Sequence, residues 1–247
     1  MSGKTEMTMQ KDSIHTLKIF GMDTEKVRGL LEDIAEKYQD VSVRIQEDAG
    51  ETYVTAFPCG SSAENNAAQL IAETGSVIGQ EYVYGVDIGG LEYALVARLK
   101  EKGMKIATAE SLTGGMVSES ITRVPGASGV LECGVCSYSN RIKHEILGVS
   151  EETLEKYTEY SAQTACEMAQ GVRSLSGADI GVATTGIAGP GGGSKERPVG
   201  LVYVGISTKD RTFAKKLLLS RGQPDERENI RILACKNALY LAWRELG

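Results

Sequence analysis

The chain has 247 residues, of which 41% are hydrophobic and 24% charged, so it can form one large domain or a larger and a smaller one. A net charge of −6 excludes the broad basic surface that general binding to nucleic acid or to an anionic membrane requires, although a single phosphate can still be bound locally. No apolar run is long enough to span a bilayer, and five widely spread cysteines indicate reduced thiols in a cytoplasmic protein.

The first predicted unit covers residues 16–87 and follows a polar stretch, residues 1–15, that is expected to be a disordered tail. Thr24 is placed as a helix N-cap because apolar residues follow it at helical spacing as far as Ile34. The pattern predicts a small α+β unit of the βαββαβ type, with strands at Thr16–Ile19, Val41–Gln46, Thr52–Phe57 and Tyr82–Tyr84 and a second helix at Ala63–Thr74.

A linker at Gly85–Gly90 leads into the second predicted unit, residues 90–247. Strands and helices alternate along it, which predicts a layered α/β/α domain with a mixed sheet. The expected helices are Leu91–Lys102, Met116–Arg123, Ile142–Leu147, Ser150–Tyr157, Ala162–Ser174 and Asp225–Leu246. The expected strands are Lys105–Thr108, Leu131–Ser139, Ile180–Ala183, Gly200–Thr208 and Thr212–Leu219, the last two forming a hairpin.

A glycine-rich turn joins the first strand and the following helix of this second unit. Gly114 and Gly115 allow a ligand to approach the backbone closely, and the helix that follows offers free N–H groups to an anion. Glu110 and Ser111 lie at the carboxyl end of the strand, where ligands of α/β proteins bind. The alternative interpretation is a tight turn that simply begins a capped helix.

A second glycine-rich segment, residues 185–194, connects two predicted strands. Its five glycines can fold backbone N–H groups into an anion-binding site or an oxyanion hole. The segment lacks the lysine of a Walker loop and the helix of a dinucleotide-binding fingerprint. An ordinary exposed loop is the alternative.

A third segment offers Ser128, a strand that ends in Tyr138, and then Lys143. A serine nucleophile needs a base, and the two histidines, His15 and His144, are poorly placed for that role. A lysine can act as the base in a Ser-Lys pair if its pKa is depressed enough for it to be neutral. The alternative is a lysine that is solvated at the surface.

Two further patterns have ordinary explanations. Cys133 and Cys136 are spaced as a CxxC, but they fall within a strand and have no second pair, so both are interpreted as core or near-core thiols. Arg227 and Arg231 are one helical turn apart and suit a phosphate or a carboxylate, although nearby acidic residues favour a solvated helix face.

Several of these motifs occur together, in order, in one known family. The segments 108–115, 126–128, 138–140, 185–190 and 198–202, with Lys143, resemble the C-terminal domain of the competence/damage-inducible protein CinA, which is also the stand-alone nicotinamide-nucleotide amidase. Residues 16–87 resemble the small middle domain of full-length CinA, and Gly79–Gly85 is typical of its end. The family's molybdopterin-binding-like first domain has no counterpart here, so the chain is expected to be a fragment without the ADP-ribose pyrophosphatase activity of that domain.

The resemblance implies that the carboxamide of nicotinamide mononucleotide is hydrolysed to nicotinate mononucleotide and ammonia through an acyl-enzyme, without cofactor or metal. It implies Ser128 as nucleophile, Lys143 as base, and Tyr138 as a residue that relays a proton or holds the lysine. It also implies self-association, most readily as a dimer, and no nucleic-acid or membrane partner. The positions expected around the nucleotide are Glu110, Ser111, Thr113, Gly114, Gly115, Asn140, Thr185, Gly186, Ala188, Gly189, Arg227 and Arg231.

Three departures from the family pattern bear on these expectations. Leu112 replaces a common cysteine, the Gly-Asp-Arg before the last helix reads Asp225-Glu226-Arg227, and Ser161-Ala162 replaces a Val-Ser-Glu-like helix start. The second of these weakens the assignment of Arg227 to the phosphate. The rival hypotheses are a nucleotide-binding module without turnover, and hydrolysis of a different amide.

Overall fold

The computed structural model describes residues 13–222 and 225–247, and its contacts divide the chain into two compact units between Ile88 and Gly89. Most of the predicted tail, residues 1–12, lies outside the described residues. The end of that tail was predicted wrongly, because His15 is already the first residue of a strand, and its Nδ1 lies 2.7 Å from Oδ2 of Asp87.

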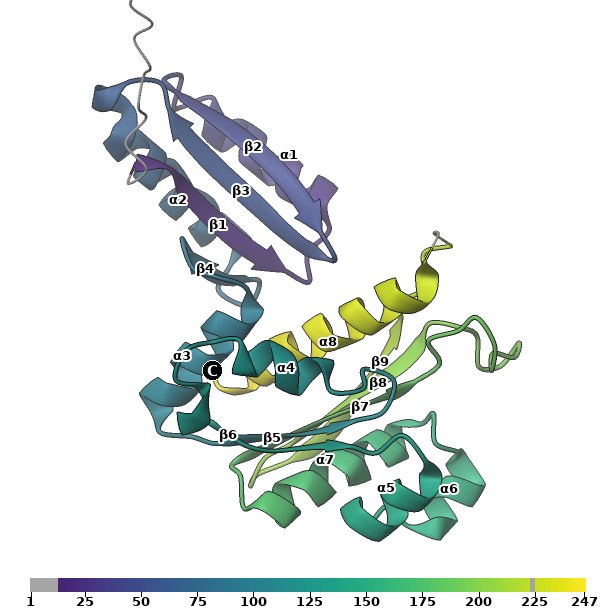
Figure 1. The fold of residues 1–247 in the computed structure, drawn as a ribbon. Helices are drawn as coiled ribbons and strands as arrows, with labels where there is room; N and C mark the ends of the chain where they lie inside the picture. Colours follow the sequence, from purple (N-terminus) through teal and green to yellow (C-terminus); the bar gives the residue numbers. More distant parts are fainter. Residues whose placement is uncertain (1–12, 223–224) are drawn as a thin grey trace, which may run out of the picture. The chain divides into compact units, whose positions relative to one another are not determined.

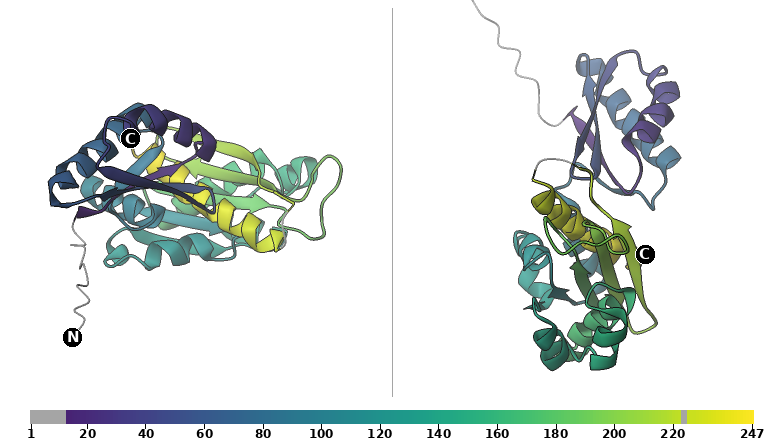
Figure 2. Two further views of the ribbon diagram at one scale, coloured as in Figure 1. Left: turned by 90° about the horizontal axis from the view of Figure 1, so that it is seen from above. Right: turned by 90° about the vertical axis from the view of Figure 1, so that its right-hand side faces the viewer.

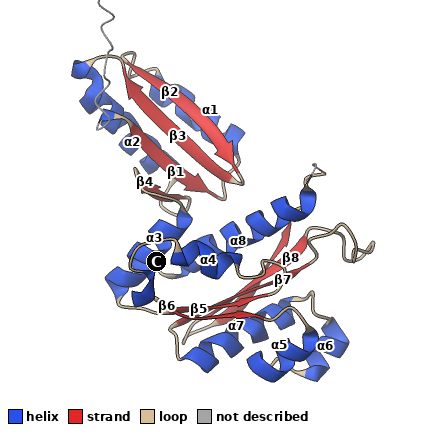
Figure 3. Cartoon of the chain, viewed as in Figure 1, coloured by secondary structure: helices blue, strands red, loops and turns tan. Residues whose placement is uncertain are grey.

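The first unit is one antiparallel sheet with two helices on one face (Figures 1 and 3). The strand order β2-β3-β1-β4 places the first and third strands at the centre. Alternate residues of these central strands are buried against the helices, as the period of a half-covered strand requires. The elements are β1 (His15–Phe20), α1 (Thr24–Ala35), β2 (Val41–Asp48), β3 (Glu51–Pro58), α2 (Glu64–Ile78) and β4 (Val83–Val86).

The N-cap of α1 is Asp23 rather than Thr24, which corrects the sequence prediction. The Asp23 side chain accepts hydrogen bonds from the backbone N–H groups of Glu25 and Lys26, and Thr24 is already helical. The Thr24 hydroxyl instead lies 2.8 Å from that of Thr52. Both residue types are good N-caps, so spacing alone does not separate two such neighbours.

The second unit is a five-stranded mixed sheet with helices on both faces, which confirms the predicted fold class (Figure 1). The strand order is β6-β5-β7-β8-β9, with β6, β5 and β7 parallel and the last two pairings antiparallel. The strands are β5 (Ile106–Glu110), β6 (Leu131–Cys136), β7 (Ile180–Gly186), β8 (Leu201–Ser207) and β9 (Thr212–Leu218). The helices are α3 (Leu91–Lys102), α4 (Met116–Thr122), α5 (Asn140–Leu147), α6 (Glu151–Tyr157), α7 (Ala162–Ser176) and α8 (Glu226–Glu245).

Two groups of helices cover this second sheet. Helices α3, α4 and α8 lie on one face, where α8 crosses β7 and β8, and α5, α6 and α7 lie on the other (Figures 1 and 2). Helix α7 approaches the strands closely because glycines face it: a Cβ atom at Gly181 or Gly205 would come within 2.0 or 2.1 Å of a backbone oxygen of α7. The described part of the chain has no helix that is both long and apolar enough to cross a membrane.

The strand β6 is shorter than predicted and lies at the edge of the sheet. It ends at Cys136, and α5 begins at Asn140 after the N-cap Ser139. Cys133 is partly buried and Cys136 is exposed, so the expectation that both thiols are core or near-core is wrong for Cys136. Because this edge strand has one partly covered face, alternate residues do not reach the core.

Candidate functional site

A pocket lies where the parallel strands β5, β6 and β7 end. Its walls come from the turn after β5, the start of α5, the α6–α7 loop, the loop after β7 and the first turn of α8. The carboxyl ends of parallel strands meet at one edge of a sheet, and ligand sites of α/β proteins form there. The lining residues are Ser111, Leu112, Tyr138, Asn140, Lys143, Glu159, Tyr160, Gly186, Ile187, Ala188, Gly189, Gly191, Gly192 and Arg227.

Lys143 is the central buried group of this pocket, and its side chain is 1% exposed. Its Nζ lies 3.0 Å from the carbonyl oxygen of Ser137 and 3.2 Å from Oγ of Ser111. Burial lowers the pKa of this amine below its ordinary value of 10.5, and the negative charge of Glu159 acts in the opposite direction. The amine is thus held beside a serine hydroxyl at a site whose burial disfavours its protonated form.

The turn after β5 fixes the position of Ser111. Its backbone N–H donates to the carbonyl of Thr184 at the end of β7, and its carbonyl accepts from the N–H of Gly114. Gly114 and Gly115 both have positive φ, at 60° and 102°, which explains the glycine pair at this point of the chain. The two glycines shape the turn but do not line the pocket.

Glu110 was predicted to contact the substrate, and the structure corrects this prediction. Its side chain is 1% exposed and is turned under the start of α4 rather than into the pocket. Its carboxylate accepts hydrogen bonds from three backbone N–H groups, those of Gly115, Val117 and Ser118, at 2.9–3.0 Å. The helix N-terminus that seemed available to a ligand anion is therefore occupied by the protein's own carboxylate.

Two predicted contact residues, Thr113 and Thr185, are fully buried supports of the site. The Thr113 hydroxyl lies 2.7 Å from both the Glu110 carboxylate and the hydroxyl of Thr184. The Thr185 hydroxyl donates to the backbone carbonyl of Glu159 over 2.5 Å. Neither threonine lines the pocket, so each can support it only by holding the residues to which it is hydrogen-bonded.

The mouth of the pocket carries Tyr138, Asn140 and Arg227. Tyr138 is 67% exposed, and its hydroxyl lies 3.4 Å from the Arg227 guanidinium, so the structure joins Tyr138 to the arginine rather than to the amine of Lys143. Arg227 also donates to the carbonyl of Gly189 in the loop after β7.

Arg231 was paired with Arg227 in the sequence prediction, but the structure separates their roles. Its guanidinium donates to the carbonyls of Leu112 and Thr113 over 3.1 and 3.2 Å and forms an ion pair with Glu228. It does not line the pocket and instead ties α8 to the turn after β5. Only Arg227 of the two is therefore placed to meet a ligand in this pocket.

Ser128 is not brought to Lys143. It is exposed and lies in a short 3-10 turn, residues 127–129, just before β6 begins at Leu131. Since β5 and β6 run parallel, this turn is at the amino ends of the strands, whereas Ser111 and Lys143 follow their carboxyl ends, roughly 16 Å of strand away. The expected Ser128–Lys143 pair is corrected to Ser111–Lys143.

Sequence reasoning did not select Glu159 and Tyr160, which form one wall of the pocket. They lie between two helices, with no glycine signature or strand end beside them. Another wall is the end of β7 at Gly186 and the loop that follows, which includes the predicted residues Ala188 and Gly189. Beyond this wall, the described loop residues 190–198 are exposed.

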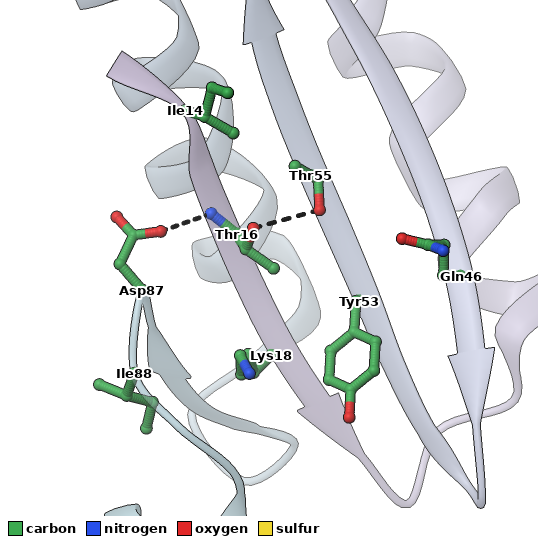
Figure 4. A pocket seen from close by; sticks show the side chains of 8 residues that line it. All are labelled: Ile14, Thr16, Lys18, Gln46, Tyr53, Thr55, Asp87 and Ile88. Atoms are coloured by element: carbon green, nitrogen blue, oxygen red, sulfur yellow. Dashed lines mark hydrogen bonds between the residues drawn. The ribbon is translucent and has the colours of Figure 1, made fainter. Parts of the chain in front are cut away.

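The first unit has a hollow of its own, of about 620 Å³, on the open face of its sheet (Figure 4). There the hydroxyls of Thr16 and Thr55 lie 3.1 Å apart, and the Lys18 ammonium is 4.9 Å from the centre of the Tyr53 ring. Its lining residues do not include a serine or cysteine beside a buried base. In the described part of the chain, no cluster of three or more His, Cys, Asp or Glu side chains could hold a metal ion.

Comparison with known sequences finds relatives along most of this chain. A protein of Caldanaerobacter subterraneus named as a competence-damage inducible protein is 40% identical over 233 residues, which are 93% of this chain and 55% of the relative. A Thermoanaerobacter pseudethanolicus protein of the same name is 37% identical, and the match covers 100% of this chain and 58% of the length of that relative. The chain thus spans little more than half the length of these relatives.

Solved structures match a smaller share of this chain but most of their own length. A competence/damage-inducible protein from Agrobacterium tumefaciens is 36% identical with a TM-score of 0.58, covering 61% of this chain and 90% of its own. A CinA superfamily protein from Escherichia coli is 30% identical with a TM-score of 0.58, covering 62% and 87%. Residues 89–246 match the family described as the CinA C-terminal domain. The chain therefore belongs to the CinA family.

Proposed function

We propose that the second unit hydrolyses the carboxamide of nicotinamide mononucleotide, with Ser111 as the nucleophile and Lys143 as its base. The observation that carries the proposal is the pair of atoms inside the pocket, the Nζ of a lysine that is 1% exposed and the Oγ of Ser111 at 3.2 Å. Family membership and the resemblance to the nicotinamide-nucleotide amidases supply the substrate. The rival function is a binding site for the same nucleotide without turnover.

Lys143 suits the role of base because its surroundings disfavour the ammonium form. Desolvation lowers its pKa, and the carbonyl of Ser137 accepts one of the two protons of the neutral amine. The lone pair is then free to accept the proton of the Ser111 hydroxyl. A lysine that is neutral near physiological pH is the known requirement for such Ser-Lys pairs.

The reaction divides into two steps. The Ser111 oxygen attacks the carboxamide carbon while its proton passes to Lys143, and the carbon–nitrogen bond then breaks as Lys143 returns that proton to the leaving ammonia. Water attacks the resulting ester while Lys143 accepts one of its protons, and the bond between the acyl carbon and the Ser111 oxygen then breaks as Lys143 returns that proton to Ser111. Nicotinate mononucleotide is released. The loop residues Gly189, Gly191 and Gly192 line the same pocket as the pair, and we assign the oxyanion to their backbone N–H groups.

The size and charge of the pocket support a nucleotide bound by one end. Its volume of about 150 Å³ is smaller than the roughly 300–1,000 Å³ of pockets that enclose a whole drug-sized ligand. It therefore suits the carboxamide ring, with the ribose and phosphate at the mouth. Arg227 lies at that mouth and presents the planar guanidinium that binds phosphate well.

The test compares Ser111→Ala with Ser128→Ala by ammonia release from nicotinamide mononucleotide. Loss of the nucleophile should lower kcat by at least about a thousandfold, whereas removal of the exposed Ser128 hydroxyl should leave turnover within about twofold of wild type. Binding of the nucleotide to the wild type without ammonia would favour the rival function. Full activity in Ser111→Ala would overturn the assignment of the nucleophile.

A further inference from the structure

The α6–α7 loop places an acidic side chain in the pocket beside the buried amine. Glu159 is partly buried and lines the same pocket as Ser111 and Lys143. Within the described residues, its carboxylate belongs to none of the ion pairs. Burial raises the pKa of its neighbour Tyr160, and the charge of this carboxylate and a hydrogen bond to it act in the same direction. Among the described residues, the pocket thus contains a carboxylate that makes no direct ion pair with Lys143 or Arg227.

The backbone of this loop is fixed from both ends. Thr158 has a φ of 70°, and its carbonyl accepts hydrogen bonds from the hydroxyls of Ser161 and Thr164 over 3.0 and 2.8 Å. The carbonyl of Glu159 itself accepts from the Thr185 hydroxyl over 2.5 Å. The carboxylate is therefore presented by a loop that is anchored to α7 and to β7.

This carboxylate opposes the chemistry proposed for Lys143. A negative charge nearby raises the pKa of the lysine and favours the ammonium form, which cannot accept the serine proton. A second cation placed against Glu159 would offset this field and lower the lysine pKa again. The ring of nicotinamide mononucleotide is such a cation, because its pyridinium nitrogen carries a positive charge and lies two ring positions from the ring carbon that bears the carboxamide.

We infer that Glu159 selects substrates whose ring beside the amide is positively charged, and that it disfavours the carboxylate product. This inference rests on the proposed function. A carboxylate in a partly desolvated pocket attracts the pyridinium ring and repels the nicotinate carboxylate, so it distinguishes substrate from product by charge. Arg227 at the mouth supplies the opposite charge for the phosphate, and the two residues together match a zwitterionic nucleotide.

The experiment compares the wild type with Glu159→Gln on two substrates of the same shape. One is nicotinamide mononucleotide, and the other is its reduced form, in which the dihydropyridine ring is neutral. The substitution should lower kcat/KM for the cationic substrate by about tenfold, and it should not lower that for the neutral one, because the neutral ring loses no attraction and Lys143 loses an opposing charge. It should weaken binding of nicotinate mononucleotide less than binding of the substrate, because the product carries the same cationic ring and an added carboxylate. Glu155→Gln, which removes an exposed carboxylate of α6 outside the pocket, is the matched control and should change neither ratio.

Equal losses on both substrates, or no loss on the cationic one, would overturn the role of Glu159. Calorimetric binding to the Ser111→Ala variant keeps the test independent of turnover. One outcome is that the Ser111→Ala variant prefers the cationic ring, the Ser111→Ala/Glu159→Gln variant does not, and the wild type releases no ammonia. That outcome contradicts the proposed hydrolysis alone. Ammonia release without charge preference contradicts the Glu159 inference alone, and binding of neither nucleotide contradicts both.

Discussion

Lys143 is one of the largest fully buried side chains of the protein, and none of its hydrogen-bond partners is a carboxylate. A charged amine at such a site loses its hydration without a compensating ion pair, so the neutral form is favoured. This single side chain therefore links two measurable quantities, the pH dependence of turnover and the pH dependence of folding.

Turnover of nicotinamide mononucleotide is expected to rise with pH as Lys143 loses its proton. The midpoint should lie below the ordinary lysine value of 10.5, because burial lowers the pKa and the opposing effect of Glu159 is smaller. Other ionisable groups that line the pocket are Tyr138, Tyr160 and Arg227. The measurement is kcat/KM by ammonia release across pH, and a rate that falls with rising pH in this range would contradict a lysine base.

The folding consequence has a defined sign. Between the lowered pKa and 10.5 the unfolded chain binds the lysine proton more fully than the folded chain does, so the free energy of unfolding falls as pH falls through this window. The slope contributed by one such group is about 1.4 kcal/mol per pH unit. The difference between the wild type and Lys143→Met should show this slope. The difference between the wild type and the exposed Lys102→Met should be flat.

The serine of the site shows what the sequence could and could not predict. Lys143 and the turn at Ser111 were both selected, but Ser128 was paired with the lysine because the two lie in one segment of the chain and the resemblance to the family implied Ser128 as nucleophile. The predicted strand bounds already placed Ser111 after a strand and Ser128 before one. Because only the carboxyl ends of parallel strands meet at a ligand site, that rule alone favoured Ser111. Glu159 offered no such signal, since a loop between two helices is placed only by tertiary packing.

At the scale of the secondary-structure element, Glu110 is the acceptor that allows α4 to begin under a glycine turn. The N-cap residue, Gly115, has no side chain to accept the first N–H groups of the helix, and the carboxylate of Glu110 replaces it from the end of β5. One side chain thus joins the sheet, the turn that holds Ser111, and the helix.

Glu110→Gln is therefore expected to destabilise the fold rather than to weaken substrate binding directly. The amide group of glutamine would face N–H donors, leaving buried groups without acceptors at a cost of about 3 kcal/mol. Denaturant unfolding measures the loss, and Glu119→Gln on the exposed side of the same helix is the control, with an expected change below about 1 kcal/mol. A Glu110→Gln protein of wild-type stability with a raised KM would restore the substrate-contact role.

The order and type of the elements were predictable because apolar periodicity and glycine breaks mark them along the chain. All nine strands that the structure describes correspond to predicted strands, with ends displaced by a few residues. The displacements have physical causes. The strand β6 stops at Cys136 because Ser139 caps α5, and β7 continues to Gly186 because it pairs with β8 as far as Val202. Such competing partners are not visible in a local pattern.

At the scale of the whole chain, each unit has its own sheet and its own buried core. The core of the first unit is built around Leu17, Val54 and Leu70, whereas Ala107, Met168 and Ala183 belong to that of the second. All residues that line the candidate pocket belong to the second unit. The solved relatives match 61–65% of this chain, which is about the share that residues 89–247 make up. That match covers 87–100% of each relative's own length.

Residues 89–247 are therefore expected to fold alone and to keep the activity of the full chain. The kcat/KM for nicotinamide mononucleotide should agree within about threefold between the two proteins, because no catalytic contact is removed. Circular dichroism and ammonia release measure folding and activity. A folded but inactive fragment would show that residues 1–88 contribute to the reaction, and the Ser111→Ala version of the fragment controls for residual activity.

The proposed bond-breaking pair and the Glu159 loop have different structural supports. Ser111 and Lys143 are held by strand ends and the first turn of α5, whereas Glu159 is held by hydrogen bonds to its backbone, which any side chain at that position would keep. An evolving or engineered enzyme could therefore exchange the residue at position 159 and acquire a neutral or anionic amide as substrate while the scissile chemistry stays intact. The α6–α7 loop is in this sense the natural place to diversify a library of amidases.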